Sequence, residues 1–416
     1  MFKFIPSALR AMSADGWLLF LARFVRLFAY GSLSVVLVFY LVSLGLTEEQ
    51  TGLIFTLTLA GDIVVSLYLT TRADRIGRRR MLIIGAVLMA AAGAAFASTK
   101  NLLFLIIAGT IGVISPSGNE VGPFLSIEQA SLSHIVPGNS RTEVFAWYTL
   151  AGSFATALGA LAGGGMAQAL QHNTVAPSAS YRSIVILYAA IGVLLALLFT
   201  RLSNQVEVAA PQKDPATKTH FFGVPRSRGV IAKLSSLFAL DSFAGGFVVQ
   251  SFAAYWFYLR FGVKPATLGA IFFWANVFAG ISALLASKLA ARIGLVRTMV
   301  FTHLPSNILL ILVPLMPNLP LAIAVLLARF SISQMDVPAR QSYTMAVVPP
   351  EERSAAGGIT GVARTTGAAI SPLFAGFLFA RPSLISVPFF LAGGLKIIYD
   401  ILLYYSFRKV HPPEEK

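Results

Sequence analysis

Long apolar stretches separated by short polar segments recur through the whole chain. Twelve of them are long enough to cross the hydrocarbon core of a membrane, which needs about 20 mostly apolar helical residues. The first six lie at Trp17–Leu41, Gly52–Leu69, Met81–Ala97, Leu102–Ser131, Val144–Ala167 and Ile184–Thr200. The other six lie at Leu234–Tyr258, Leu268–Leu289, Met299–Leu315, Leu319–Met345, Ala355–Phe379 and Leu384–Tyr405. This pattern predicts an all-α integral membrane protein with twelve transmembrane helices in two pseudo-symmetric six-helix bundles.

The composition agrees with a chain that lives in lipid. Of its 416 residues, 56% are hydrophobic and 12% are charged, whereas a soluble chain carries about 25% charged residues. The net charge of +15 could indicate a nucleic-acid partner, but the basic residues lie in the connections between apolar stretches and form no single stripe. We therefore predict a lipid bilayer as the surroundings and no nucleic acid. The chain has no cysteine, so neither a disulfide nor a thiolate metal site is expected.

The basic residues also predict the orientation. With the N-terminus placed in the cytoplasm, 22 of the 32 Lys and Arg residues fall in cytoplasmic segments. Five fall on the opposite side: Lys100, Arg182, Arg260, Lys264 and Arg381. Such an excess is typical of cytoplasmic loops, so we expect both termini in the cytoplasm and the protein in the cell membrane. The polar stretch 203–229 predicts a flexible cytoplasmic linker between an N-terminal bundle (1–202) and a C-terminal bundle (230–416).

The two halves share a weak internal repeat, as the halves of many transporters do. At an offset of 212 residues, Gln129, Pro137, Arg141 and Gly164 correspond to Gln341, Pro349, Arg353 and Gly376. At an offset of 217 residues, Arg75-Ile76-Gly77 corresponds to Arg292-Ile293-Gly294. Both matches fall at equivalent places between predicted spans, which indicates two related bundles.

The loop after the second span carries a known signature. Its sequence Asp74-Arg75-Ile76-Gly77-Arg78-Arg79 resembles the loop motif of the major facilitator superfamily. The resemblance implies a cytoplasmic latch formed by Asp74, Arg75, Gly77 and Arg78, with Arg141 and Arg353 in the later cytoplasmic turns of each half. Two residues depart from the family pattern, since Thr70 and Arg72 stand where the family has Gly and an apolar residue. The alternative is a basic loop that only fixes topology.

Small residues recur in the fifth and eleventh spans. The fifth contains Gly159, Gly163 and Gly164, and the eleventh contains Pro372 and Gly376. The fifth span resembles the glycine motif of the antiporter branch of the superfamily, although Ala160 replaces its proline and Gly109 stands near the place of an arginine that antiporters carry. The resemblance implies export. Close helix packing by small residues is the alternative explanation.

Ten ionisable residues fall inside the predicted spans, where each is costly unless it faces the interior of the bundle. They are Arg23, Arg26, Asp62, Glu120, Asp241, Arg329, Asp336, Arg364, Lys396 and Asp400. Five are basic and five are acidic, which favours mutual pairing around a central cavity.

Helical spacing groups some of these residues. Arg23, Arg26 and Tyr30 are three and seven positions apart, so they share one face of the first helix. Asp62 lies on a comparable polar stripe of the second helix with Thr58 and Ser66. We predict substrate or proton coupling at this helix pair, with a structural salt bridge as the alternative. Asp241, near the middle of the seventh span, is predicted to have the same role.

Proline and glycine surround another candidate. Glu120 stands among Pro116, Gly118, Gly122 and Pro123, which loosen a helix as in transporter binding sites. Asp336, beside Pro338, is predicted as its counterpart in the second half.

Two further expectations concern pairing and depth. We expect Glu128 and Arg340 near the cytoplasmic mouth, as gate or surface residues. Lys396 and Asp400 are expected to form a private pair within one helix.

These observations favour one class of function. The chain has no phosphate-binding loop and no H-E-x-x-H zinc motif, so we predict neither an ATPase nor an enzyme, and no cofactor or metal. We predict a monomeric secondary active transporter that moves a small organic solute by alternating access, coupled to protons, with export preferred. The alternatives are uptake of an organic anion bound by Arg23 or Arg26, and a non-transporting receptor or scaffold.

Overall fold

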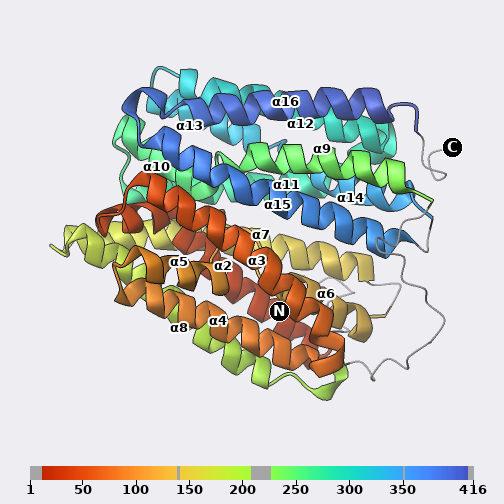
Figure 1. The fold of residues 1–416 in the computed structure, drawn as a ribbon, viewed down its shortest axis with the longest axis horizontal. Coiled ribbons are helices and arrows are strands. Elements are labelled where there is room, and N and C mark those ends of the chain that lie inside the picture. The colour runs from red at the N-terminus through yellow and green to blue at the C-terminus, as the bar shows by residue number, and fades with distance from the viewer. Residues whose placement is uncertain (1–11, 138–140, 208–225, 350–351, 411–416) are drawn as a thin grey trace, which may run out of the picture. The chain divides into compact units, whose positions relative to one another are not determined.

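The computed structural model describes residues 12–137, 141–207, 226–349 and 352–410, and every regular element within them is a helix (Figure 1). The earlier helices are α2 (Ala14–Ser43), α3 (Glu48–Ile76), α4 (Arg78–Ser98), α5 (Leu102–Ile111), α6 (Phe124–Ile135), α7 (Arg141–His172) and α8 (Pro177–Thr200). The later ones are α9 (Arg228–Gly246), α10 (Gln250–Phe261), α11 (Pro265–Ile293), α12 (Leu295–Leu312), α13 (Leu319–Phe330), α14 (Asp336–Ala346), α15 (Arg353–Phe379) and α16 (Val387–Phe407). Most of the expected linker, 208–225, lies outside the described residues.

The described helices have the length and surface of membrane spans. Ten helical segments are long and apolar enough to cross a membrane, and Leu102–Ile111 and Leu319–Phe330 are shorter apolar helices. Large apolar side chains on them are exposed, among them Val64 (67%) and Leu103 (63%). A soluble protein avoids apolar surface of this extent, whereas lipid requires it. The predicted all-α membrane fold is confirmed.

Three of the predicted spans each consist of two helices. The fourth is split into α5 and α6, the tenth into α13 and α14, and the seventh into α9 and α10. In the fourth span, Gly118 and Gly122 lie between α5 and α6 with φ values of 72° and 82°, which favour glycine and do not occur in a right-handed helix. Pro123 then precedes α6. The glycines and prolines that we interpreted as loosening the helix interrupt it completely.

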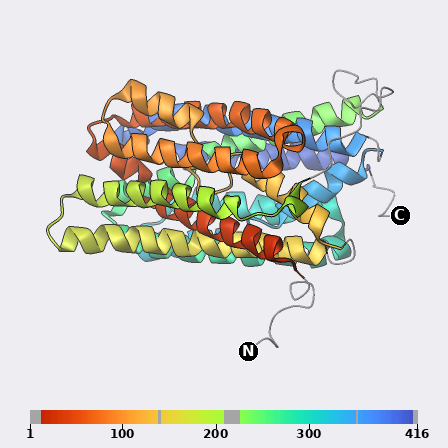
Figure 2. The same ribbon diagram turned by 90° about the horizontal axis from the view of Figure 1, so that it is seen from below.

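The chain divides into two compact units. Unit 1 consists of Met1–Leu46, Gly61–Lys213 and Lys264–Phe273, and unit 2 of Thr47–Ala60, Asp214–Val263 and Trp274–Lys416. The division falls inside α3 and α11. In unit 1, α2 packs along α7 and α8, and α4 along α8; Figure 2 shows α7 and α8, in yellow and yellow-green, beside the red α2. In unit 2, α9 packs along α15 and α16, and α12 along α16. Each unit therefore repeats the same packing order.

Glycines bring helix backbones into contact within each unit. A Cβ atom on Gly159 would lie 2.0 Å from the carbonyl oxygen of Phe28, and one on Gly163 would lie 2.4 Å from that of Ser32. In unit 2, a Cβ on Gly367 would lie 2.2 Å from the carbonyl oxygen of Ala239. Only glycine fits at such distances, so α2 and α7, and likewise α9 and α15, pack backbone against backbone.

A second kind of close crossing involves Gly164 and Gly376, which correspond at the offset of 212. A Cβ on Gly164 would lie 2.2 Å from the carbonyl oxygen of Pro265, and one on Gly376 would lie 2.4 Å from that of Glu48. The carbonyl oxygen of Pro372 is likewise 2.4 Å from the place of a Cβ on Gly52. Packing thus accounts for these small residues in both copies of the repeat.

Candidate functional site

A buried ion pair lies at the centre of unit 1. The guanidinium group of Arg26 on α2 donates to both carboxylate oxygens of Glu128 on α6, at 2.5 and 2.7 Å. The hydroxyl group of Tyr148 on α7 donates to the same carboxylate, and the Arg26 guanidinium lies 4.5 Å from the ring centroid of Phe124. All three charged or polar side chains are fully buried. The expectation of Glu128 as a surface residue is therefore wrong, because α6 starts at Phe124 and turns Glu128 inward; its place near the cytoplasmic mouth stays a prediction.

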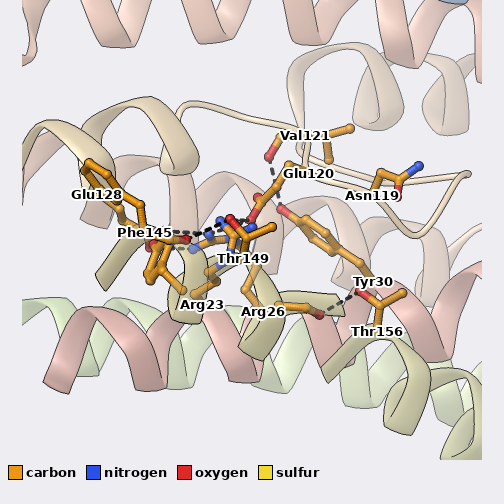
Figure 3. A network of polar contacts seen from close by, with 12 residues as sticks. Arg23, Arg26, Tyr30, Asn119, Glu120, Val121, Glu128, Phe145, Thr149 and Thr156 are labelled. Carbon is orange, nitrogen blue, oxygen red and sulfur yellow. Dashed lines mark hydrogen bonds and ion pairs between the residues drawn. The ribbon is translucent and has the colours of Figure 1, made fainter. Parts of the chain in front are cut away.

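The interrupted fourth span supplies a second carboxylate to the same arginines. Glu120 accepts from Arg26 Nη2 at 3.2 Å and lies 2.8 Å from Nη1 of Arg23. Arg23 also lies over the ring of Tyr148, 4.4 Å from its centroid. Figure 3 shows Arg23 and Arg26 extending together toward Glu120 and Glu128. The shared helix face predicted for the two arginines thus meets the Pro- and Gly-rich segment, and we name these four residues with Tyr148 the first polar network.

Hydroxyl groups from three helices hold the interrupted segment in place. Tyr30 on α2 donates to the carbonyl oxygen of Val121 at 3.3 Å, and Thr156 on α7 donates to that of Gly118 at 3.4 Å. Tyr188 on α8 donates to the carbonyl oxygen of Val113. These bonds satisfy backbone groups that a continuous helix would have paired itself, as required inside a membrane.

Asp62 lies at the same segment but belongs to no ion pair. Its carboxylate accepts from the backbone amide of Gly122 at 2.6 Å and from the hydroxyl of Ser66 at 3.0 Å. No Lys, Arg or His side chain in the described part of the chain lies within 4.0 Å of it. Its side chain is directed at the broken span rather than at lipid. Asp62 is thus an interior carboxylate without a cation.

Unit 2 contains a second polar network: Asp241, His303, Asp336, Arg340, Lys396 and Asp400. The carboxylate of Asp241 on α9 accepts from Arg340 on α14 at 2.9 Å and from Lys396 on α16 at 2.5 Å. Asp336 lies 3.5 Å from Arg340. Arg340 is 4% exposed, so it too is a buried residue and not a surface residue.

A histidine that the sequence analysis did not select joins this network. His303 Nδ1 lies 2.8 Å from Asp400, its Nε2 lies 3.7 Å from Asp241, and Asn307 donates to Asp400 at 2.9 Å. The expected private pair of Lys396 with Asp400 is therefore wrong, because each has a closer partner on another helix. His303 and Asn307 are four positions apart in α12, which also carries the buried polar residues Thr298, Thr302 and Ser306, and no sequence motif marks them.

The central ion pairs of the two units correspond, with their signs exchanged. Glu128 and Arg340 occupy the same position at the offset of 212, immediately before Gln129 and Gln341. Glu128 pairs with Arg26 on α2, the first helix described in unit 1, while Arg340 pairs with Asp241 on α9, the first full helix of unit 2. Both units therefore have a buried salt bridge at equivalent positions. In unit 1 the first helix carries the basic residue, and in unit 2 it carries the acidic residue.

Four residues of the expected latch lie where α3 ends and α4 begins: Asp74, Arg75, Gly77 and Arg78. Arg78 Nε donates to Asp74 at 2.8 Å, and Gly77 has a φ of 117°, which favours glycine. Glu207 accepts from the backbone amides of Arg78 and Arg79 at 2.7 and 3.1 Å, a favourable place for a carboxylate at a helix N-terminus. Arg75 lies in the last turn of α3, and Arg353 begins α15. Arg141 begins α7, but its side chain lies outside the described residues.

Glu352 in unit 2, like Glu207 in unit 1, accepts hydrogen bonds from backbone amides at the start of a helix. It accepts from the backbone amides of Arg226 and Ser227, just before α9, at 2.8 and 3.1 Å. Desolvation opposes its ionisation, but these hydrogen bonds outweigh it and hold the pKa of Glu352 below the ordinary value of 4.5.

This lowered pKa predicts a pH-dependent stability. A carboxylate with a lowered pKa stabilises the fold above its ordinary pKa, and the contribution is lost as pH falls through the lowered value. Glu352→Gln should therefore reduce the melting temperature at neutral pH, and its difference from the wild type should shrink once pH falls below 4.5. Glu143→Gln, at an exposed site on α7, serves as the control. A difference that stays constant down to acid pH would contradict this role.

No metal centre accompanies these networks in the residues that the structure describes, where no group of three or more His, Asp or Glu side chains could hold an ion. The chemistry on offer is charge pairing, hydrogen bonding and proton exchange.

Comparison with solved structures shows the same fold in transporters. A mutant form of the nucleoside transporter NupG superposes with a TM-score of 0.75 at 12% identity, covering 94% of this chain and 100% of that chain. A bacterial homologue of the iron transporter ferroportin, in an inward-facing state, superposes with a TM-score of 0.72 at 14% identity, covering 96% and 99%. A bacterial homologue of the human lysosomal transporter Spinster gives 0.67 at 16% identity, covering 95% and 96%.

One relative is more similar in sequence than these solved structures. The uncharacterized membrane protein YJR124C of Saccharomyces cerevisiae is 31% identical over 422 residues, which cover 95% of this chain and 94% of the relative. The family model described as Major Facilitator Superfamily matches residues 19–260 and 234–416, that is, each half of the molecule separately. Two related helical bundles, paired intramembrane charges and these matches together show a multi-pass membrane transporter rather than an enzyme, and the chain belongs to the major facilitator superfamily.

Proposed function

We propose that the protein is a proton-coupled secondary transporter that moves a small organic solute by alternating access. Membership of the family supports transport, and the interrupted fourth and tenth spans support a solute site within the bundle. Discontinuous helices near the middle of a membrane expose backbone groups that transporters use for binding. Glu120 lies in one interruption, and Asp336 begins the helix that follows the other.

The observation that carries proton coupling is the unpaired carboxylate of Asp62. An ionised carboxylate without a cation is unfavourable in an apolar interior, and a proton removes that charge. The carboxylates of Glu128 and Asp241 are instead held in salt bridges, and Glu120 is shared between two arginines. We propose Asp62 as the proton carrier and Glu120 as the group to which its charge state is communicated, because the two carboxylates repel each other electrostatically.

The remaining sequence predictions enter this proposal with defined roles. Arg23, Arg26 and Tyr30 position Glu120 and the broken span, and Asp241 and Asp336 do the same for Arg340. We propose that the latch at Asp74 and Arg78 stabilises one conformation of the transport cycle, together with Arg75, Gly77, Arg141 and Arg353. We further propose both termini in the cytoplasm, residence in the cell membrane, a monomer, and export as the direction. Export is supported only by the glycine-rich sequence of α7.

Asp62→Asn tests the proposal. Asparagine can keep the hydrogen bonds to Gly122 and Ser66 but cannot carry a proton. A thermal-shift screen of the purified protein against metabolites and drugs first identifies a solute, which is then used in proteoliposomes. We expect accumulation driven by a pH gradient to fall at least about tenfold, a change of ~1.4 kcal/mol in the barrier, while counterflow without a gradient continues.

Two controls sharpen this result. Asp62→Glu, which keeps an ionisable group, should retain part of the gradient-driven accumulation. Glu143→Gln, which removes an exposed carboxylate at the start of α7, should leave accumulation and counterflow unchanged. Full gradient-driven accumulation by Asp62→Asn would show that another group carries the proton. Absence of transport of any solute by the wild type would favour a receptor or scaffold.

A further inference from the structure

The intramembrane charges of unit 2 do not balance. Its carboxylates are Asp241, Asp336 and Asp400, and its permanent cations are Arg329, Arg340, Arg364 and Lys396. Asp241 is shared by Arg340 and Lys396, Asp336 lies beside Arg340, and Asp400 bonds to His303 and Asn307. Every carboxylate is thus taken, and two arginines are left over.

The two arginines are Arg329, in the last turn of α13, and Arg364, near the middle of α15. Neither has a carboxylate within 4.0 Å among the described residues. The Nε atom of each is buried and has no hydrogen-bond partner. Both side chains are partly exposed and interact electrostatically with Asp241 and Asp336, so the two guanidinium groups border the second polar network and stay accessible in part.

This arrangement is unlike that of unit 1. There, both intramembrane arginines have a glutamate partner. The position that corresponds to Arg364 at the offset of 212 is Gly152, where a Cβ would lie 2.6 Å from Nε of Arg23. At this position unit 2 carries an arginine side chain of its own. Unit 1 carries a glycine there, and the space beside it is filled by Arg23 from α2. Arg364 is also repelled by the positive charge of Arg340. An additional anion bound at Arg364 would reduce this repulsion.

We infer that Arg329 and Arg364 bind the acidic group, a carboxylate or a phosphate, of the transported solute. The inference rests on the proposed transport function and names the class of its substrate. An unpaired charge within a membrane span needs a partner, and a guanidinium group matches a carboxylate or phosphate with two parallel hydrogen bonds. Arg23 and Arg26, the arginines that the sequence offered for this role, already have such partners in Glu120 and Glu128. The anion site is accordingly assigned to unit 2.

The test measures binding without transport. The full chain is placed in phosphatidylcholine nanodiscs, and its melting temperature is measured with benzoate, succinate, citrate and glucose 6-phosphate at constant ionic strength. Benzamide, succinamide and glucose are the neutral counterparts. At least one anion should raise the melting temperature by about 2–4 °C, as a ligand that binds only the folded state does. Its neutral counterpart should not.

Variants then assign the binding to these side chains. Arg329→Gln and Arg364→Gln should lose the anion-dependent shift, Arg329→Lys and Arg364→Lys should keep part of it, and Arg260→Gln, at an exposed position on α10, should behave as the wild type. Without anion, the two glutamine variants should be at least as stable as the wild type, because they remove an unpaired charge. Arg340→Gln should be less stable than the wild type, because Asp241 would lose one of its two cationic partners.

Several outcomes would overturn the inference. One is destabilisation of Arg329→Gln and Arg364→Gln equal to that of Arg340→Gln, since this would reveal a structural partner. Another is stabilisation only by anionic lipid added to the nanodiscs, and by no soluble anion. Proton-driven transport of a neutral solute with no anion binding would overturn the anion site alone, whereas anion binding without any transport would overturn the transport proposal alone.

Discussion

Arg26→Gln is expected to destabilise the folded protein by about 3–5 kcal/mol, the usual cost of removing one partner from a buried salt bridge. Glu128 would lose the bidentate partner that holds both of its oxygens at 2.5 and 2.7 Å. The hydroxyl of Tyr148 cannot replace a positive charge. Thermal and denaturant unfolding of the protein in nanodiscs would measure the loss, with Arg182→Gln, at an exposed site on α8, as the control. If Arg26→Gln were as stable as the wild type, the Arg26–Glu128 salt bridge would contribute nothing to the free energy of unfolding.

A charge exchange tests the same pair more stringently. The equivalent pair of unit 2, Asp241–Arg340, has the acidic residue on the first helix and the basic residue on the later one. We therefore expect the pair in unit 1 to tolerate the same exchange of charges. Arg26→Glu combined with Glu128→Arg should therefore recover part of the stability that Arg26→Glu alone loses. Recovery cannot be complete, because Glu120 lies 3.2 Å from the Arg26 guanidinium and would then face a like charge. A double variant no more stable than Arg26→Glu would contradict the equivalence of the two pairs.

Gly159→Ala is the second change with a large expected effect. Its new methyl group would lie 2.0 Å from the carbonyl oxygen of Phe28, where no side chain can move aside because both atoms belong to rigid helices. α2 and α7 would have to separate, and overpacking of this kind costs about 1–3 kcal/mol or more. Folded yield and melting temperature of the purified protein would both fall.

The same helix offers a matched control. Gly165 has no atom within 4 Å of the place where a Cβ would stand. Alanine is a better helix former than glycine by about 0.8–1.0 kcal/mol, so Gly165→Ala should be neutral or stabilising. Equal effects of the two substitutions would show that the close crossing of α2 and α7 is not what limits position 159.

The sequence was sufficient for the features that depend on local periodicity. Apolar length located the spans, and helical spacing placed Arg23 and Arg26 on one face, where the structure finds them with a common partner in Glu120. The proline and glycine residues around Glu120 marked the segment that interrupts the fourth span. These properties follow from a few neighbouring residues, so they could be predicted without knowledge of the tertiary structure.

Pairing between distant helices could not be obtained in this way. Lys396 and Asp400 looked like partners because they are one turn apart, yet Asp241, 155 residues away from Lys396, lies 2.5 Å from it. Glu128 and Arg340 were expected as gate or surface residues, yet both are buried in ion pairs with residues of distant helices. His303 has no sequence motif at all, and its role depends on α12 and α16 lying side by side. Long-range packing decided each of these cases.

The boundary between the two compact units falls inside two continuous helices, so these helices are shared by both units. α3 has 29 residues and is about 44 Å long at 1.5 Å per residue, with Thr47–Ala60 in unit 2 and the rest in unit 1. A Cβ on Gly61 would lie 1.9 Å from the carbonyl oxygen of Thr110, which fixes the remaining part of α3 against α5. α11 is divided in the same way between Phe273 and Trp274. α3 and α11 therefore each run without a break from one unit into the other, so a substitution that interrupts either helix acts on both units at once.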